Sequence, residues 1–146
     1  MPISLRITAL IFVFMTLAAG VARADEAFAE KKVVLQISDA IPEKQTLVLN
    51  VANNLLTHYG QDKVDVEVVA LGPGLKLLFA DNANKARIKS LAAAGVRFSA
   101  CQNTLKAMAA QNGGVAPALL PEAQPTPAGI ARIVDLEEQG YHNIRP

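Results

Sequence analysis

A short strand is predicted to run directly into a helix in the sequence Val96-Arg97-Phe98-Ser99-Ala100-Cys101-Gln102-Asn103-Thr104. Residues 96–100 are predicted as the strand, and Leu105, Met108 and Ala109 are expected to face inward from the helix. A strand that leads at once into a helix is the building unit of a parallel sheet. This segment therefore favours an α/β fold.

The same alternation of strand and helix continues on both sides of this segment. On the N-terminal side we expect, in chain order, a buried strand at 33–37, a helix at 42–59, a strand at 64–71, a turn at 72–74 with a helical turn over 75–80, and a helix at 84–94. On the C-terminal side we expect a short strand or extended piece at 118–120, a stiff proline-rich connection at 121–127, a helix at 128–139 and a last strand at 141–144. The alternation predicts an α/β fold with a mainly parallel sheet of about five strands, covered by helices on both faces.

Two of these elements carry a prediction about which side chains face the core. Asp65 and Glu67 alternate with valines at the start of the strand 64–71, so this strand is expected to emerge from solvent into the core. In the last helix, Ile130, Ile133 and Val134 are expected to face inward.

The N-terminus has the pattern of a secretory signal peptide over residues 1–24. Arg6 precedes an apolar run at 7–21, and Ala22-Arg23-Ala24 forms an A-x-A cleavage site. The run is shorter than the ~20 residues that a membrane span needs, so cleavage after Ala24 is favoured over a retained anchor, and no stable membrane insertion is expected afterwards. We therefore expect a periplasmic or secreted protein whose mature part, residues 25–146, is a single domain.

The charge of the chain excludes some classes of partner. The full sequence has a formal charge of +1, and loss of Arg6 and Arg23 with the leader changes it to −1. A nearly neutral chain without a basic stripe offers no electrostatic attraction to nucleic acid or to an anionic membrane surface. We expect neither as a partner.

Cys101, the only cysteine, is the main candidate for a functional site. In an α/β sheet, catalytic and binding groups gather at the carboxyl ends of the strands, where Cys101 is predicted to lie, near the turns after residues 37 and 71. A thiol in the first turn of a helix is favoured as a thiolate by the helix dipole and by free backbone N–H groups. Asn103 and Thr104 could hold a second sulfur or an anion beside it. The alternative is that Cys101 is a small buried hydrophobic residue.

Other chemical sites have weaker support in the sequence. His58 and His142 have no Cys, His or acidic neighbour at the spacing of metal ligands, so no metal is expected. Gly72 and Gly74 lack the further glycine or lysine of a nucleotide-binding loop, and a turn that ends the strand explains them better.

Three parts of the mature chain together resemble the DsrE/DsrF-like sulfur-relay family. They are the opening Val33-Val34-Leu35-Gln36-Ile37-Ser38, the strand and helix start from Val96 to Leu105, and the end from Ala128 to Pro146 with its Gly140-Tyr141 pair. The resemblance implies a three-layer α/β/α domain that assembles into homotrimers or hexamers. It also implies that Cys101 carries sulfur as a persulfide, without a metal or an organic cofactor.

Two classes of function follow from these observations. In the first, the protein is an exported sulfur carrier or thiol redox module that uses Cys101 and exchanges sulfur with a donor or acceptor protein. In the second, it is a non-enzymatic oligomeric module for binding or assembly, in which Cys101 has only a structural role. A disulfide between two subunits is a third option, because a lone cysteine in an oxidising compartment can pair only with another molecule.

Overall fold

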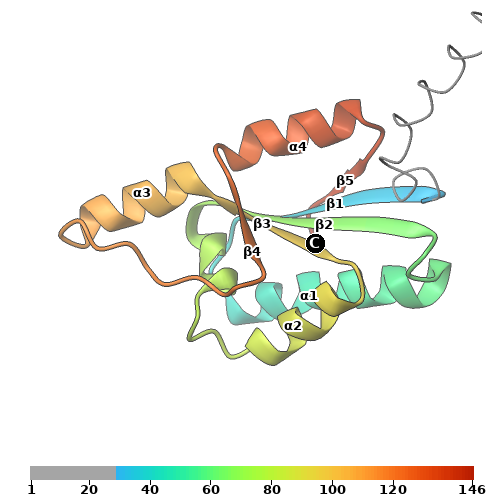
Figure 1. The fold of residues 1–146 in the computed structure, drawn as a ribbon, viewed down its shortest axis with the longest axis horizontal. Coiled ribbons are helices and arrows are strands. Elements are labelled where there is room, and N and C mark those ends of the chain that lie inside the picture. Colours follow the sequence, from blue (N-terminus) through green and yellow to red (C-terminus); the bar gives the residue numbers. More distant parts are fainter. Residues whose placement is uncertain (1–28) are drawn as a thin grey trace, which may run out of the picture.

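The structure is a computed structural model that describes residues 29–146, so the predicted signal peptide lies outside the described residues (Figure 1). The elements are, in chain order, β1 Lys31–Ile37, α1 Pro42–Tyr59, β2 Val64–Ala70, the 3₁₀-helix η1 Gly72–Leu78, α2 Lys85–Ala93, β3 Arg97–Cys101, α3 Gln102–Gln111, β4 Ala123–Thr126, α4 Gly129–Glu138 and β5 His142–Ile144. All strand pairs are parallel, in the order β4-β3-β2-β1-β5. The predicted α/β fold with a five-stranded parallel sheet is confirmed.

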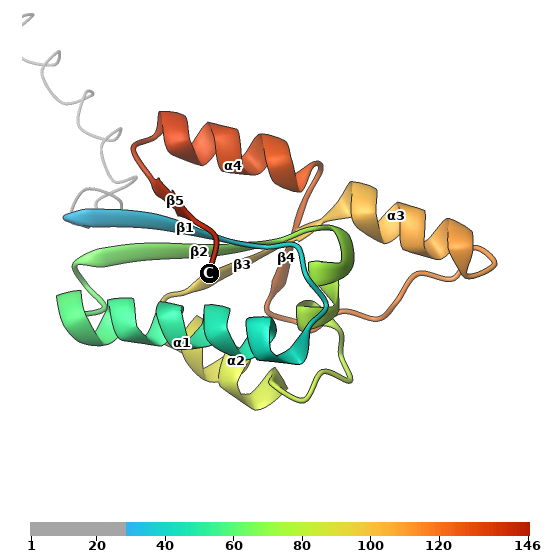
Figure 2. The same cartoon turned by 180° about the vertical axis from the view of Figure 1, so that it is seen from behind.

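The helices form layers on the two faces of the sheet. Helices α1 and α2 cover one face and α4 covers the other, as both views show (Figure 1, Figure 2). The larger apolar core lies on the α1 face, where Leu35, Val68 and Phe98 from neighbouring strands are buried against Leu49 of α1. Because successive residues of a strand point to opposite faces, the α4 face receives Cys101 together with every second residue before it in β3.

Helix α3 has a different position from the other helices. It continues from the carboxyl end of β3 and projects away from the sheet (Figure 1). Its predicted inward residues Leu105 and Met108 are only partly buried, and none of the α3 side chains, all of which are described, is fully buried. The first turn of α3 is therefore held mainly by its connections to the neighbouring loops.

The fourth strand lies at residues 123–126, so of the two options for residues 118–120, a short strand or an extended piece, the second is correct. That earlier piece is extended, but it pairs with the end of η1 through an antiparallel bridge between Leu119 and Phe79. The strand itself includes Pro125, which the sequence pattern assigned to a stiff connection. β4 is at the edge of the sheet and has one neighbour, so a residue without an N–H group is tolerated there.

The inward face of α4 also differs from the prediction. Ile133 is buried as expected, but Ile130 and Val134 are 60% and 48% exposed. The buried residues Gly129, Ile133 and Leu136 are spaced by four and three positions, which defines the face that contacts the sheet. In this orientation Gly129 lies against Cys101 and Leu71.

Gly74 holds two strand ends together at the carboxyl edge of the sheet. A Cβ atom at this position would lie 2.3 Å from the carbonyl oxygen of Ile37 and 2.8 Å from the Cα of Ser38. Both are backbone atoms of the β1 end, which cannot move without shifting the strand. The η1 turn therefore packs against the end of β1 only because residue 74 is glycine.

We expect Gly74→Ala to lower the free energy of unfolding by about 3 kcal/mol, because the new methyl group overlaps backbone that cannot relax. Gly113→Ala is the matched control. Gly113 has a φ of 62°, but a Cβ atom added there would have nothing within 4 Å, so only the backbone conformation is penalised, by about 1 kcal/mol. Urea denaturation of both variants gives the comparison, and equal losses would contradict this account of Gly74.

Candidate functional site

Cys101 lies where two helices begin. It is the last residue of β3 and the residue that precedes α3, and only 5% of its surface is exposed. The backbone N–H of Gly129, the first residue of α4, donates a hydrogen bond to the sulfur over 3.2 Å. The N-termini of α3 and α4 thus meet at one sulfur atom, and both present the positive end of a helix dipole to it.

Gly129 makes the approach of α4 to the sulfur possible. A Cβ atom at this position would lie 3.1 Å from the Cβ of Leu71 and 3.2 Å from the Cβ of Cys101. Any larger residue would push the start of α4 away from β3. The absence of a side chain therefore brings the N–H group within hydrogen-bonding distance of the sulfur.

Thr104 connects Cys101 to the turn after β2. The N–H of Gly72 donates to the hydroxyl oxygen of Thr104 over 2.9 Å. The same hydroxyl also acts on Cys101, where it lowers the pKa of the thiol. Because the oxygen already accepts from Gly72, its own hydrogen is free to be donated to the sulfur.

Asn103 contributes to this site through its backbone. Its N–H donates to the carbonyl of Pro127 over 3.2 Å and also lowers the pKa of the Cys101 thiol. Its side chain is exposed at the surface of α3. Of the two residues proposed to assist Cys101, Thr104 thus acts on the pKa of the thiol through its side chain and Asn103 through its backbone N–H.

The surroundings of Cys101 favour the thiolate. Burial raises the pKa of this thiol, whereas the Thr104 hydroxyl and the N–H groups of Gly129, Thr104 and Asn103 lower it. The hydrogen bonds outweigh burial, and the pKa lies below its ordinary value. A thiolate is the form of cysteine that attacks sulfur and carbon electrophiles.

A buried carboxylate lies on the same face of the sheet, where Glu67 of β2 pairs with Arg97, four positions before Cys101 in β3. Glu67 has no exposed surface and accepts hydrogen bonds from three side chains. Arg132 of α4 binds both carboxylate oxygens, over 2.8 and 2.7 Å, Ser99 binds one over 2.6 Å, and Arg97 binds one over 3.1 Å. These partners hold the pKa of Glu67 below its ordinary value against the effect of burial.

The polar network continues from Glu67 to the end of α4. Arg97 also donates to Asp65 over 3.1 Å and to the hydroxyl of Tyr141 over 2.9 Å. Tyr141 in turn donates to Asp65. The prediction that Asp65 and Glu67 face solvent was wrong for Glu67, because α4 and the arginines cover that part of β2.

The three predicted loops meet at the carboxyl edge of the sheet as expected. The N–H of Leu71, after β2, donates to the carbonyl of Ile37, after β1, over 3.1 Å, and Gly72 binds Thr104 after β3. Asp39 in the first loop forms salt bridges with Lys44 and Arg145. The sequence did not identify Gly129, the fourth contributor to this edge of the sheet, because β4, the strand that precedes it, was expected earlier in the chain.

The histidines do not form a metal site with other residues of the described chain. His58 packs edge to face against Tyr59, and His142 is exposed in β5. Within residues 29–146, no group of three His, Cys, Asp or Glu side chains is arranged to hold a metal ion, and no helix is long and apolar enough to cross a membrane.

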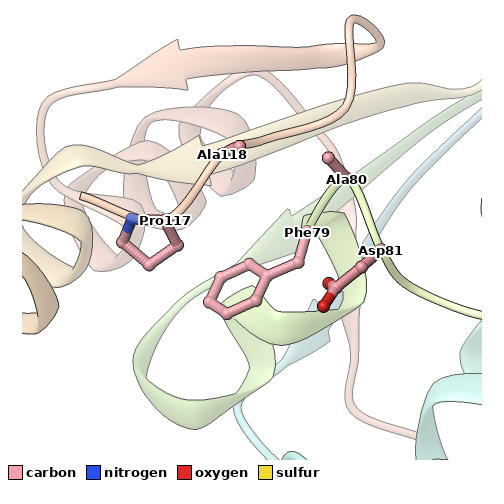
Figure 3. Close-up of a pocket in the computed structure, with 5 residues that line it drawn as sticks. All are labelled: Phe79, Ala80, Asp81, Pro117 and Ala118. Atoms are coloured by element: carbon pink, nitrogen blue, oxygen red, sulfur yellow. The ribbon is translucent and has the colours of Figure 1, made fainter. Parts of the chain in front are cut away.

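An open groove lies beside the end of η1, away from the contacts of Cys101. It has a volume of about 310 Å³ and is lined by Phe79, Ala80, Asp81, Pro117 and Ala118 (Figure 3). Its lining is apolar apart from the carboxylate of Asp81. It includes none of the residues that bind the sulfur of Cys101.

The chain is similar to a known protein family and to a solved structure. A family model described as the DsrE/DsrF-like family matches residues 9–146. A solved structure, that of the protein of unknown function MTH1491 from Methanobacterium thermoautotrophicum, is 30% identical, with a TM-score of 0.71 over 80% of this chain and 99% of that one. No curated protein matches the chain.

Replacing Thr104 tests the hydrogen bonds at the sulfur. Thr104→Val keeps the shape of the side chain but removes the hydroxyl, so the pKa of Cys101 should rise and the midpoint of its pH-dependent alkylation should move to higher pH. Thr104→Ser retains the hydroxyl and should keep the midpoint near that of the wild type. A midpoint that is the same in the valine and serine variants would show that the hydroxyl does not act on the sulfur.

Proposed function

The chain belongs to the DsrE/DsrF-like family, and we propose that it is a sulfur carrier or thiol redox module that holds sulfane sulfur on Cys101 as a persulfide. We propose further that it acts in the periplasm or outside the cell after loss of residues 1–24, as a homotrimer or homohexamer. The exposed Ile130 and Val134 of α4 offer apolar surface for such an assembly. A donor or acceptor of sulfur would be its partner.

The proposed reaction needs a thiolate and no cofactor. The Cys101 thiolate attacks the terminal sulfur of a donor persulfide, R–S–SH. The sulfur–sulfur bond of the donor breaks, a new one forms to Cys101, and the donor leaves as the thiolate R–S⁻. The number of disulfide-type bonds is unchanged, so no oxidant or reductant is consumed, and transfer to an acceptor thiolate is the same step in reverse.

The observation that carries this proposal is the meeting of two helix N-termini at one sulfur. Donors from Gly129 and Thr104 favour a negative charge on Cys101 even though burial opposes it. The same donors would favour the deprotonated persulfide, which is also an anion. A cysteine that served only to fill space would need none of these donors.

Access to the sulfur requires a local opening of the structure, because Cys101 is only 5% exposed. Helix α3 has no fully buried side chain, and only its partly buried Leu105 and Met108 pack against the core. Segments with few buried contacts open at the lowest free energy. We infer that movement of the first turn of α3 admits the donor and that reclosure shields the persulfide.

The low exposure of Cys101 also supports the second candidate function. In a binding or assembly module, the sulfur would accept hydrogen bonds from Gly129 and Thr104 only to fix the starts of α4 and α3. Cys101→Ser would then preserve both the oligomer and the biological activity. Loss of activity in a folded serine variant would argue against this alternative.

Incubation of the native protein with polysulfide should add the mass of one sulfur at Cys101. Mass spectrometry of the intact protein and of its peptides measures the addition, and a reducing agent should reverse it. Cys101→Ser, which has no thiol, is the control and should gain nothing. A folded wild type that gains no sulfur, while the same chain does so in denaturant, would contradict the carrier function.

A further inference from the structure

The carboxylate of Glu67 joins three elements on the face of the sheet that also carries Cys101. Glu67 belongs to β2, Ser99 and Arg97 to β3, and Arg132 to α4. Ser99 precedes Cys101 by two residues on the same face of β3. The Glu67 carboxylate thus connects β2, β3 and α4, which lie around the sulfur on this face of the sheet. The first turn of α3 also lies at the sulfur but does not contact Glu67.

Arg132 is the contact that belongs to α4. It follows Gly129 by three residues, which is slightly less than one helical turn. Its guanidinium binds both oxygens of Glu67, over 2.8 and 2.7 Å, and a paired contact of this kind fixes direction as well as distance. The hydrogen bond from Gly129 to Cys101 therefore begins within one turn of the strongest polar anchor of the helix.

The apolar contacts of α4 cannot supply this directional control by themselves. Ile133 and Leu136 are buried against Val34 and Val69 of the sheet. Hydrophobic contact is not directional, so it holds the helix onto the sheet but leaves small movements along the helix axis nearly free. A shift of about 1 Å at Gly129 would stretch its 3.2 Å bond to the sulfur beyond hydrogen-bonding range.

We propose that Glu67 and Arg132 are positioning residues for Cys101, whose paired contact sets the start of α4 against β3 and thereby holds the Gly129 N–H on the sulfur. The proposal deepens the proposed carrier function and rests on it for its biological meaning. The geometry it describes can be tested without any sulfur donor.

A direct effect of charge is the rival explanation, and it predicts a different sign. The charged and titratable groups around Glu67 are Arg97 and Asp65 from the strands, Arg132 from α4, Tyr141 after α4, and Lys32, which lies 5.7 Å from the Tyr141 ring. If only charge mattered, Glu67→Gln would remove a negative charge and make the Cys101 thiolate easier to form. If positioning matters, the same variant loosens α4 and makes the thiolate harder to form.

The measurement is the rate of Cys101 alkylation as a function of pH. Greater exposure of a loosened site multiplies the rate at every pH, whereas loss of the Gly129 hydrogen bond moves the midpoint. Since Cys101 is the only cysteine, the signal has one source. Circular dichroism and labelling in denaturant establish that each variant is folded and that its thiol is intact.

Three variants separate the explanations. Arg132→Lys keeps the positive charge on a partly exposed side chain but loses the paired contact with Glu67. Glu67→Gln removes the negative charge of the carboxylate. In both we expect the midpoint to move to higher pH, so that the rate at pH 7, relative to its high-pH limit, falls about three- to fivefold, as for loss of one hydrogen bond. Arg97→Lys, which changes a partner of the same carboxylate on β3, is the matched control and should leave the midpoint in place.

An unchanged midpoint in Arg132→Lys would overturn the proposal, as would a lower midpoint in Glu67→Gln. An equal shift in Arg97→Lys would also overturn it, because the effect would then not depend on the paired contact between Arg132 and Glu67. If Glu67→Gln does not fold, Arg132→Lys with its control still decides the question. Wild-type protein that takes up no sulfur would refute the carrier function but would not affect this comparison.

Discussion

A carboxylate without any exposed surface lies in the middle strand of this sheet, and the polar side chains on the α4 face are arranged around it. An unpaired buried charge costs several kcal/mol, so Glu67 is compatible with the folded state only when its oxygens are bound. Arg132, Ser99 and Arg97 supply the donors from α4 and β3. The need to satisfy this one group therefore fixes how α4 sits on the sheet, and with it the surroundings of the only cysteine.

At Cys101 two opposing effects meet. Burial disfavours a charged sulfur, but Gly129 and Thr104 place donors on it, and the N-termini of two helices point toward it. The site is assembled from the connections that follow β2, β3 and β4, so no single segment contains it. This combination of shielding and anion stabilisation suits a sulfur atom that must be reactive when the site opens and protected when it closes.

The sequence predicted the order and type of most elements, because apolar periodicity and glycine stops act locally. It also placed Cys101 correctly at a strand end and a helix start. It failed where contacts between residues far apart in the sequence determine the structure. Glu67 is buried by an arginine 65 positions away, and α4 places Gly129 against Cys101 in an orientation that exposes Ile130. β4 was missed because Pro125 resembles a linker residue, although an edge strand accepts it.

The folded chain lowers the pKa of the Cys101 thiol, and every chemical role proposed for this residue depends on that effect. The most direct test compares the pH dependence of Cys101 alkylation in the native wild-type chain with that of the same chain unfolded in denaturant. The hydrogen bonds at the sulfur exist only in the folded state, so the account predicts a midpoint at lower pH in the native protein. A native midpoint equal to or above that of the unfolded chain would show that burial prevails and would contradict it.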